Sequence, residues 1–141
     1  MNVSREAAVL LAMASKDIDL LRFIVCSDLV ADEIFGFHAQ QAVEKSLKAW
    51  VYLAGGTFDR IHDVRRLLIV LQDAGFDVKP YKELISLNSF AVQFRYESME
   101  EDDVPLDRTD TLLKAEALYK HVLNFMSARY YRADIKLRTC L

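Results

Sequence analysis

The sequence predicts an all-α fold, an antiparallel up-and-down bundle of four to five helices. Apolar residues recur at steps of three and four along most of the chain, as they do on the buried face of a helix. Gly55-Gly56, Gly75 and Pro80 separate these periodic segments, and the alternating pattern of a strand is almost absent. Because the connections between helices are short, neighbouring helices are expected to run antiparallel.

The periodicity predicts five helices in succession. Their approximate ranges are 3–25, 33–54, 63–74, 80–96 and 108–129. Glycine pairs or single glycines end the second and third helices, and Pro80 suits the first turn of the fourth. We therefore assign residues 1–128 to one helical bundle and residues 129–141 to a basic C-terminal tail or an extension of the last helix.

Length and composition are those of one domain with one core. The chain has 141 residues, of which 52% are apolar and 11% aromatic, and this length is enough for one core and too short for two. The net charge of −3 gives no general attraction to nucleic acid, so nucleic-acid binding would need a local basic patch. Cys26 and Cys140 have no metal-ligand spacing, and we expect reduced thiols in the cytoplasm.

The first helix begins with an apolar run that could pass for a short export signal. Glu6 stands at the head of this run, and apolar residues continue at helical spacing through Ile18, Leu21 and Val25. A cleaved signal does not need that periodicity, so we expect a structural helix. A membrane span is not expected either, because the chain has no run of about 18 apolar residues.

The second helix has two faces with different chemistry. At about 100° per residue, one face is apolar and should line the core. This face comprises Phe35, Ala39, Ala42, Val43, Ser46, Trp50 and Leu53. A second line of side chains, here called the polar stripe, extends about 20 Å along the helix. The polar stripe comprises His38, Gln41, Lys45, Lys48 and Tyr52. It is either a solvated or subunit-facing surface or a surface that binds a ligand or partner.

Several single residues near the polar stripe have alternative interpretations. Gly36 costs about 1 kcal/mol relative to alanine inside a helix, so either it allows close packing between helices or it keeps space open beside His38. Asp63 is well placed to cap the third helix, and His62 either packs or adds a polar group to the stripe. His121, next to the apolar face of the last helix, is expected to be structural.

Residues 37–49 resemble the signature helix of the HEPN family, small helical domains found in prokaryotes and in some higher eukaryotes. The matching residues are Phe37, His38, Gln40, Gln41, Glu44, Lys45, Leu47, Lys48 and Ala49. His62-Asp63 matches a dipeptide that commonly precedes the family's next helix, and Arg95-Tyr96 is a weaker match. The resemblance covers roughly residues 3–128. It implies a helical bundle, frequent dimerisation, and association with minimal nucleotidyltransferases or RNA metabolism.

Other chemical motifs are missing from the sequence. There is no Gly-rich phosphate loop, no His-Glu-x-x-His metal helix and no Gly-x-Ser-x-Gly elbow. The acidic segment 97–103 lacks the sharp glycine turn of a cation loop, so we expect a solvated loop with no metal and no cofactor. The tail after Ser127 interleaves basic and aromatic residues, a pattern that can track phosphates and stack bases.

The resemblance also raises the hypothesis of an RNase. Many HEPN proteins resemble metal-independent endoribonucleases with an Arg-x4–6-His motif, in which the arginine would steady the phosphate and the histidine would transfer a proton. No arginine of this chain is followed by a histidine at that spacing. Catalytic residues are therefore not assigned, and a noncatalytic protein is the preferred interpretation.

The sequence thus predicts a noncatalytic HEPN-like module that binds a nucleotide, RNA or a partner nucleotidyltransferase. We expect a cytoplasmic homodimer, with one half of a toxin-antitoxin-type pair among the roles that fit. The candidate binding residues are His38, Gln41, Lys45, Lys48, His62 and Arg95. In this hypothesis the lysines face phosphate, and Gln41 and His38 supply directional hydrogen bonds. The alternatives are a metal-independent endoribonuclease with a non-standard residue set and a purely structural interaction protein.

Overall fold

The described part of the protein is helical, which confirms the predicted all-α class. The computed structural model describes residues 3–58, 60–91 and 105–139, and these ranges contain helices and turns without strands. The elements are α1 (Val3–Ile24), α2 (Asp32–Leu53), α3 (Val64–Asp73), the 3-10 helix η1 (Lys79–Leu87) and α5 (Arg108–Thr139). Among these residues, no helix is both long and apolar enough to cross a membrane.

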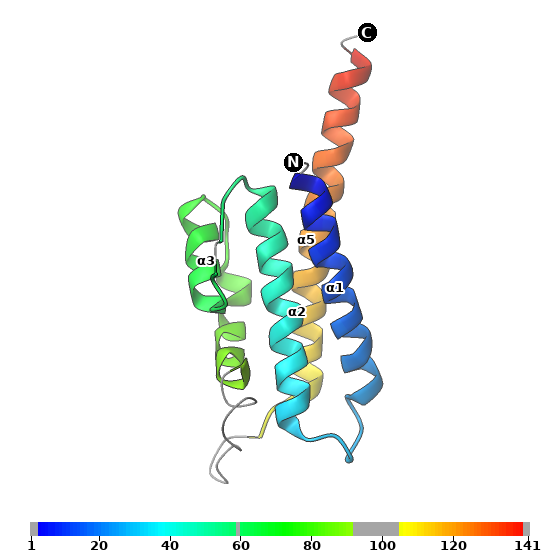
Figure 1. Ribbon diagram of the computed structural model, residues 1–141, viewed down its shortest axis with the longest axis vertical. Coiled ribbons are helices and arrows are strands. Elements are labelled where there is room, and N and C mark those ends of the chain that lie inside the picture. The colour runs from blue at the N-terminus through cyan, green and yellow to red at the C-terminus, as the bar shows by residue number, and fades with distance from the viewer. Residues whose placement is uncertain (1–2, 59, 92–104, 140–141) are drawn as a thin grey trace.

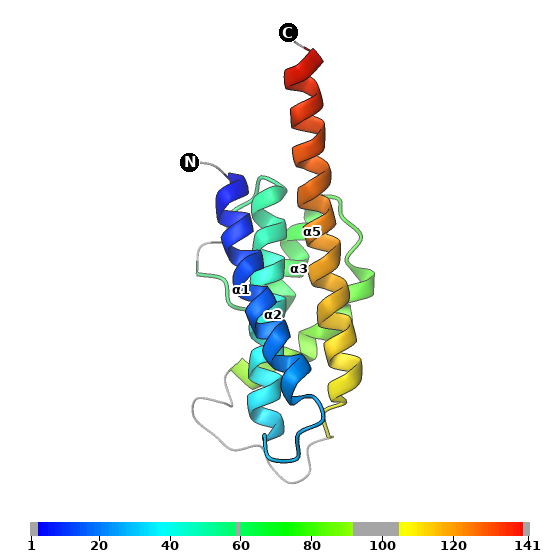
Figure 2. The same ribbon diagram turned by 90° about the vertical axis from the view of Figure 1, so that its right-hand side faces the viewer.

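Three long helices form the body of the molecule. Helix α1 runs antiparallel to α2 and to α5, whereas α2 and α5 run in the same direction (Figures 1 and 2). A short turn joins only α1 to α2, and α2 and α5 are parallel neighbours, so the predicted antiparallel up-and-down arrangement is not confirmed for the bundle as a whole. With 32 residues, α5 is about 48 Å long, so its C-terminal part projects beyond the other helices (Figure 1).

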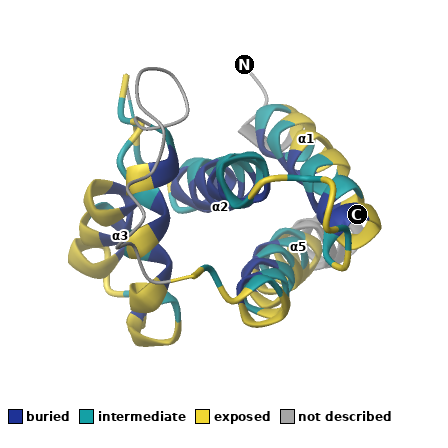
Figure 3. Cartoon of the chain, turned by 90° about the horizontal axis from the view of Figure 1, so that it is seen from below, coloured by how far each residue is buried: buried dark blue, intermediate teal, exposed yellow. Residues whose placement is uncertain are grey.

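Helix α2 is the central element of the bundle. It is packed against α1, α3, η1 and α5, and seen end-on it lies between α3 and the pair formed by α1 and α5 (Figure 3). The predicted core face is confirmed. All seven of its residues are buried: Phe35, Ala39, Ala42, Val43, Ser46, Trp50 and Leu53. Leu47 and Val51 are also buried, because α3 and η1 cover a side of α2 that a thinner bundle would expose.

The turns use the residue types that the sequence analysis singled out. Gly55 and Gly75 follow α2 and α3 with φ of 83° and 96°, the left-handed region in which glycine has no steric penalty. Asp63 is the N-cap of α3, where its carboxylate accepts a hydrogen bond from the backbone N–H of Arg65 at 2.8 Å. These observations confirm the predicted ends of the two helices.

Gly36 allows the segment after η1 to pack directly on α2. A Cβ atom at this position would lie 2.3 Å from Cδ1 of Phe90, whose side chain is itself buried. Close packing is therefore the correct one of the two explanations for this glycine. The space beside its backbone is filled by the aromatic ring and is not open to a ligand.

The fourth helical segment differs from the expected regular helix. It begins as the 3-10 helix η1, and residues 88–91 then continue in α-helical conformation; residues 92–96 lie outside the described ranges. Apolar side chains recur at steps of three, and a 3-10 helix with 3 residues per turn places them on one side. These residues are Val78, Tyr81, Leu84, Leu87 and Phe90. The spacing is thus compatible with a 3-10 helix, and packing against α2 and α3 favours this form over a regular helix.

Arg108, the first residue of α5, binds to the turn between α1 and α2. Its guanidinium donates hydrogen bonds to the carbonyl oxygens of Ile24, Ser27 and Val30, and its Nε lies 2.8 Å from Oδ1 of Asp32. The same group lies over the ring of Phe35, 5.4 Å from its centroid. A planar, permanently charged donor can satisfy several carbonyl groups at a helix end, so Arg108 fixes the lower end of all three long helices.

Candidate functional site

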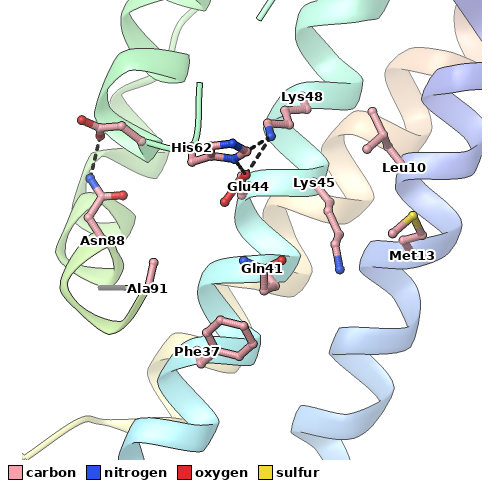
Figure 4. Close-up of a pocket in the computed structure, with 11 residues that line it drawn as sticks. Leu10, Met13, Phe37, Gln41, Glu44, Lys45, Lys48, His62, Asn88 and Ala91 are labelled. Carbon is pink, nitrogen blue, oxygen red and sulfur yellow. Dashed lines mark hydrogen bonds and ion pairs between the residues drawn. The ribbon is translucent and has the colours of Figure 1, made fainter. Parts of the chain in front are cut away.

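A pocket of about 650 Å³ opens along the polar stripe of α2 (Figure 4). Its walls come from α1, from α2, from the residues just before α3, and from the segment after η1. The lining residues are Leu10, Met13, Phe37, Gln41, Glu44, Lys45, Lys48, His62, Asp63, Asn88 and Ala91. Four of the six predicted binding residues thus line one cavity, within the usual size range of small-molecule sites.

The first polar group of the pocket, here called the Glu44 cluster, joins α2 to the loop before α3. Oε1 of Glu44 lies 2.7 Å from Nζ of Lys48 and 2.9 Å from Nδ1 of His62, and Oε2 accepts a hydrogen bond from Gln40 at 2.7 Å. Burial alone raises the pKa of Glu44. The hydrogen bonds from Lys48, His62 and Gln40 together outweigh burial, so this pKa lies below its ordinary value of 4.5. The cluster therefore holds an ionised carboxylate inside the pocket wall.

The second polar group, here called the Asp17 cluster, joins α2 to α1. The Asp17 carboxylate accepts a hydrogen bond from Nζ of Lys45 at 2.7 Å, and its other oxygen lies 3.1 Å from Nδ1 of His38. Figure 4 shows Lys45 turned toward α1, away from Glu44 and His62. His38 is held at this side of α2 and is not among the residues that line the pocket.

A third polar group closes the pocket at the start of α3. The Asn88 side chain donates to Asp63 Oδ1 at 2.7 Å and accepts from the backbone N–H of Val64 at 2.9 Å. Together with the Asp63 cap, this arrangement satisfies the first N–H groups of α3. The backbone N–H groups of Val64 and Arg65 are therefore already hydrogen-bonded to side chains of the protein.

Apolar side chains complete the pocket. Leu10 and Met13 face it from α1, Phe37 lies on the preceding turns of α2, and Ala91 lies on the opposite side (Figure 4). A cavity with apolar walls and a few polar groups resembles sites that bind flat, partly polar organic molecules. Among the residues that the structure describes, no group of three or more His, Cys, Asp or Glu side chains is arranged to hold a metal ion.

The remaining predicted residues lie elsewhere. Tyr52 is on the same face of α2 but contacts Phe58, with ring centroids 4.6 Å apart, and does not line the pocket. Arg95 and the acidic segment 97–103 lie outside the described residues. His121 packs against the ring of Trp50 with centroids 4.8 Å apart, as a structural residue would.

The sequence analysis missed the importance of two acidic residues. Glu44 was recognisable as the partner of Lys48 one helical turn away, but its role as the centre of a cluster depends on His62 from another segment. Asp17 carried no signal, because it lies 28 residues from Lys45 and 21 from His38 in the sequence. Both carboxylates change the chemistry of the stripe, since they neutralise its lysines.

The fold and the signature helix agree with a comparison against protein-family models. The model of the HEPN domain matches residues 8–130. The chain belongs to the HEPN family. The matched range includes every residue that lines the pocket, and HEPN domains are helical and often related to nucleotides or RNA. No curated protein and no solved structure matches the chain.

Proposed function

We propose that this HEPN domain is a noncatalytic module that binds a nucleotide in the pocket beside α2. One observation is the main support for this proposal. A single cavity is lined by four predicted binding residues, Gln41, Lys45, Lys48 and His62, together with Met13 and Phe37. The flat heterocyclic base of a nucleotide matches the apolar side chains of the pocket, and the hydrogen-bonding groups of the nucleotide match its polar side chains. The cavity volume of about 650 Å³ is suitable for such a ligand.

Binding of nucleotides can be measured directly by calorimetry or by NMR titration. Gln41→Ala removes an amide at the centre of the pocket and should weaken binding by roughly tenfold, the effect of one lost hydrogen bond of about 1.4 kcal/mol. Gln72→Ala is the matched control, because Gln72 is an exposed amide near the end of α3. Equal affinities for both variants, or no binding of any nucleotide by the unaltered protein, would contradict the proposal.

A metal-independent endoribonuclease is the second candidate function. It is favoured by one observation: Nδ1 of His38 and Nδ1 of His62 each lie beside a carboxylate, an arrangement that orients an imidazole for proton transfer. Against it, the lysines that would stabilise a phosphate are paired with the same carboxylates. Incubation with single-stranded RNA and a chelator should give no cleavage. Cleavage that disappears in both His38→Ala and His62→Ala would establish the nuclease instead.

The proposal includes a cytoplasmic homodimer that cooperates with a minimal nucleotidyltransferase, as in a toxin-antitoxin-type pair. Support comes from α1, where Val9 and Phe23 share one face of the helix and have exposed fractions of 53% and 86%. Exposed apolar residues on one helix face suit a protein interface. Light scattering should give twice the chain mass, and Phe23→Glu should reduce it to the monomer mass. A monomer mass for the unaltered protein at micromolar concentration would overturn the dimer.

A further inference from the structure

The lysines of the pocket are not available as phosphate ligands. Lys45 is bound to Asp17 and Lys48 to Glu44, each with 2.7 Å between nitrogen and oxygen. Their side chains are only 20% and 12% exposed, so water screens these pairs weakly. A phosphate that approached either lysine would also approach its carboxylate at almost the same distance. The attraction and the repulsion would then largely cancel.

The charges around the pocket favour a neutral group over an anion. Two lysines face three carboxylates, those of Asp17, Glu44 and Asp63, so the balance is negative when the histidines are neutral. Asp63 is committed to the cap of α3 and to Asn88 and therefore remains in place. A nucleotide that entered with its phosphates first would meet this negative charge, and none of the described residues that line the pocket offers it an unpaired lysine or arginine.

The neutral atoms of the pocket match the base of a nucleotide. Met13 and Phe37 offer polarisable and aromatic surfaces on which a planar ring can stack. Gln41 donates one N–H to Gln40 at 2.7 Å, which leaves its carbonyl oxygen and a second N–H for a ligand. An amide with a free donor and a free acceptor can pair with the edge of a base.

We infer that the pocket accepts the base of a nucleotide and leaves the phosphates outside, and that Asp17 enforces this preference by neutralising Lys45 beside His38. The inference rests on the proposed nucleotide-binding function and specifies which part of the ligand is recognised. It assigns to Lys45 and Lys48 a role in shaping the pocket, in place of the phosphate contacts expected from the polar stripe.

A ligand series tests the inference on the unaltered protein. For each base, the nucleoside and its 5′-mono-, di- and triphosphate are titrated by calorimetry, together with ribose 5-phosphate and pyrophosphate. We expect nucleoside and triphosphate to bind within about threefold of each other, and the two base-free compounds not to compete. Raising the salt concentration from about 50 to about 500 mM should change the affinity by less than about threefold, because no net phosphate contact is made.

Asp17→Asn tests the proposed selectivity residue by a gain of binding. The asparagine keeps the size and a hydrogen-bond acceptor but removes the negative charge, so the positive charge of Lys45 is no longer balanced. The affinity ratio of triphosphate to nucleoside should rise by about fivefold or more, while nucleoside affinity stays within about twofold. Asp19→Asn is the control, because it removes the same charge from the same helix at a residue paired with Arg22.

The possible outcomes separate the two proposals. If no nucleoside and no nucleotide binds, the proposed function fails and the inference fails with it. If nucleotides bind but each added phosphate strengthens binding about tenfold, or pyrophosphate competes, nucleotide binding stands and the inference is overturned. An unchanged ratio in a folded Asp17→Asn variant, checked by its melting curve, overturns the role of Asp17.

Discussion

The Glu44 cluster and the Asp17 cluster contain the same three kinds of side chain but differ in origin. In each, a carboxylate accepts a hydrogen bond from a lysine of α2 and lies beside Nδ1 of a histidine. Glu44 belongs to α2 itself, and its lysine is one turn further along the same helix. Asp17 comes from α1 and binds a lysine and a histidine of α2, so this cluster ties two long helices together.

The two clusters also differ in burial. Glu44 and Lys48 are 8% and 12% exposed, and the Glu44 oxygens take part in three hydrogen bonds, whereas Asp17 and Lys45 are 12% and 20% exposed. The histidines show the opposite order, with His62 72% and His38 29% exposed. An unpaired charge costs more free energy the less water can reach it. The comparison indicates that the Glu44 cluster contributes more to the stability of the fold. A change in the Asp17 cluster costs less stability, so this cluster can affect ligand binding without unfolding the protein.

The largest effect is expected from Glu44→Ala. The substitution leaves Lys48 as a largely buried cation without its partner and also removes the acceptor of Gln40. We expect the free energy of unfolding, measured in urea, to fall by about 3–5 kcal/mol. Glu83→Ala is the control, since Glu83 is 75% exposed and forms only a surface ion pair with Lys114, and it should change stability little. A loss no larger than that of the control would show that the Glu44 cluster is not a stabilising element.

Asp17→Ala should have a smaller effect. Lys45 and His38 lose their common partner, but at 20% and 29% exposure they regain more hydration than Lys48 does at 12%. The expected loss of unfolding free energy is about 1–2 kcal/mol. In the double variant His38→Ala/Lys45→Ala, a further Asp17→Ala change should cost less than it does alone, because its partners are already missing. Additive effects would mean that the three residues do not form one unit.

The stability that Glu44 contributes should depend on pH in the acidic range. The pKa of Glu44 is lower in the folded protein than its ordinary value of 4.5, so the unfolded chain binds its proton more readily. The stabilisation from this group is complete above pH 4.5 and is lost as the pH falls through the lowered pKa. The difference in unfolding free energy between the unaltered protein and Glu44→Gln should therefore shrink from pH 7 toward pH 3. A difference that grows on acidification would contradict the direction of this pKa change.

The smallest effect is expected from His62→Ala. The His62 side chain is 72% exposed, and Lys48 and Gln40 remain bound to Glu44 when it is removed. The melting temperature should fall by no more than about 1–2 °C, in line with a surface contact worth a few tenths of a kcal/mol. A fall as large as that of Asp17→Ala would place His62 at the structural centre of its cluster.

Local spacing explains why several features of the fold were predictable. The buried face of α2 follows from a period of 3.6 residues, and the cap at Asp63 and the end at Gly75 follow from the chemistry of single residues. The 3-10 helix η1 was not predicted, although apolar residues at steps of three precede and follow Leu84. A three-residue period is compatible with both helix types over a short stretch, so only packing against α2 and α3 distinguishes them.

The sequence by itself determined that α2 carries an apolar face and a polar stripe, because both depend on side-chain positions along one helix. Only the tertiary structure decided that a pocket lies along the stripe and that Asp17 and Glu44 neutralise its lysines. Lys45 and Asp17 are 28 residues apart, and His62 and Glu44 are 18 apart. Their hydrogen bonds form only when α1 and the loop before α3 pack against α2. The charge that a ligand would meet is therefore set by helix packing, which no local pattern contains.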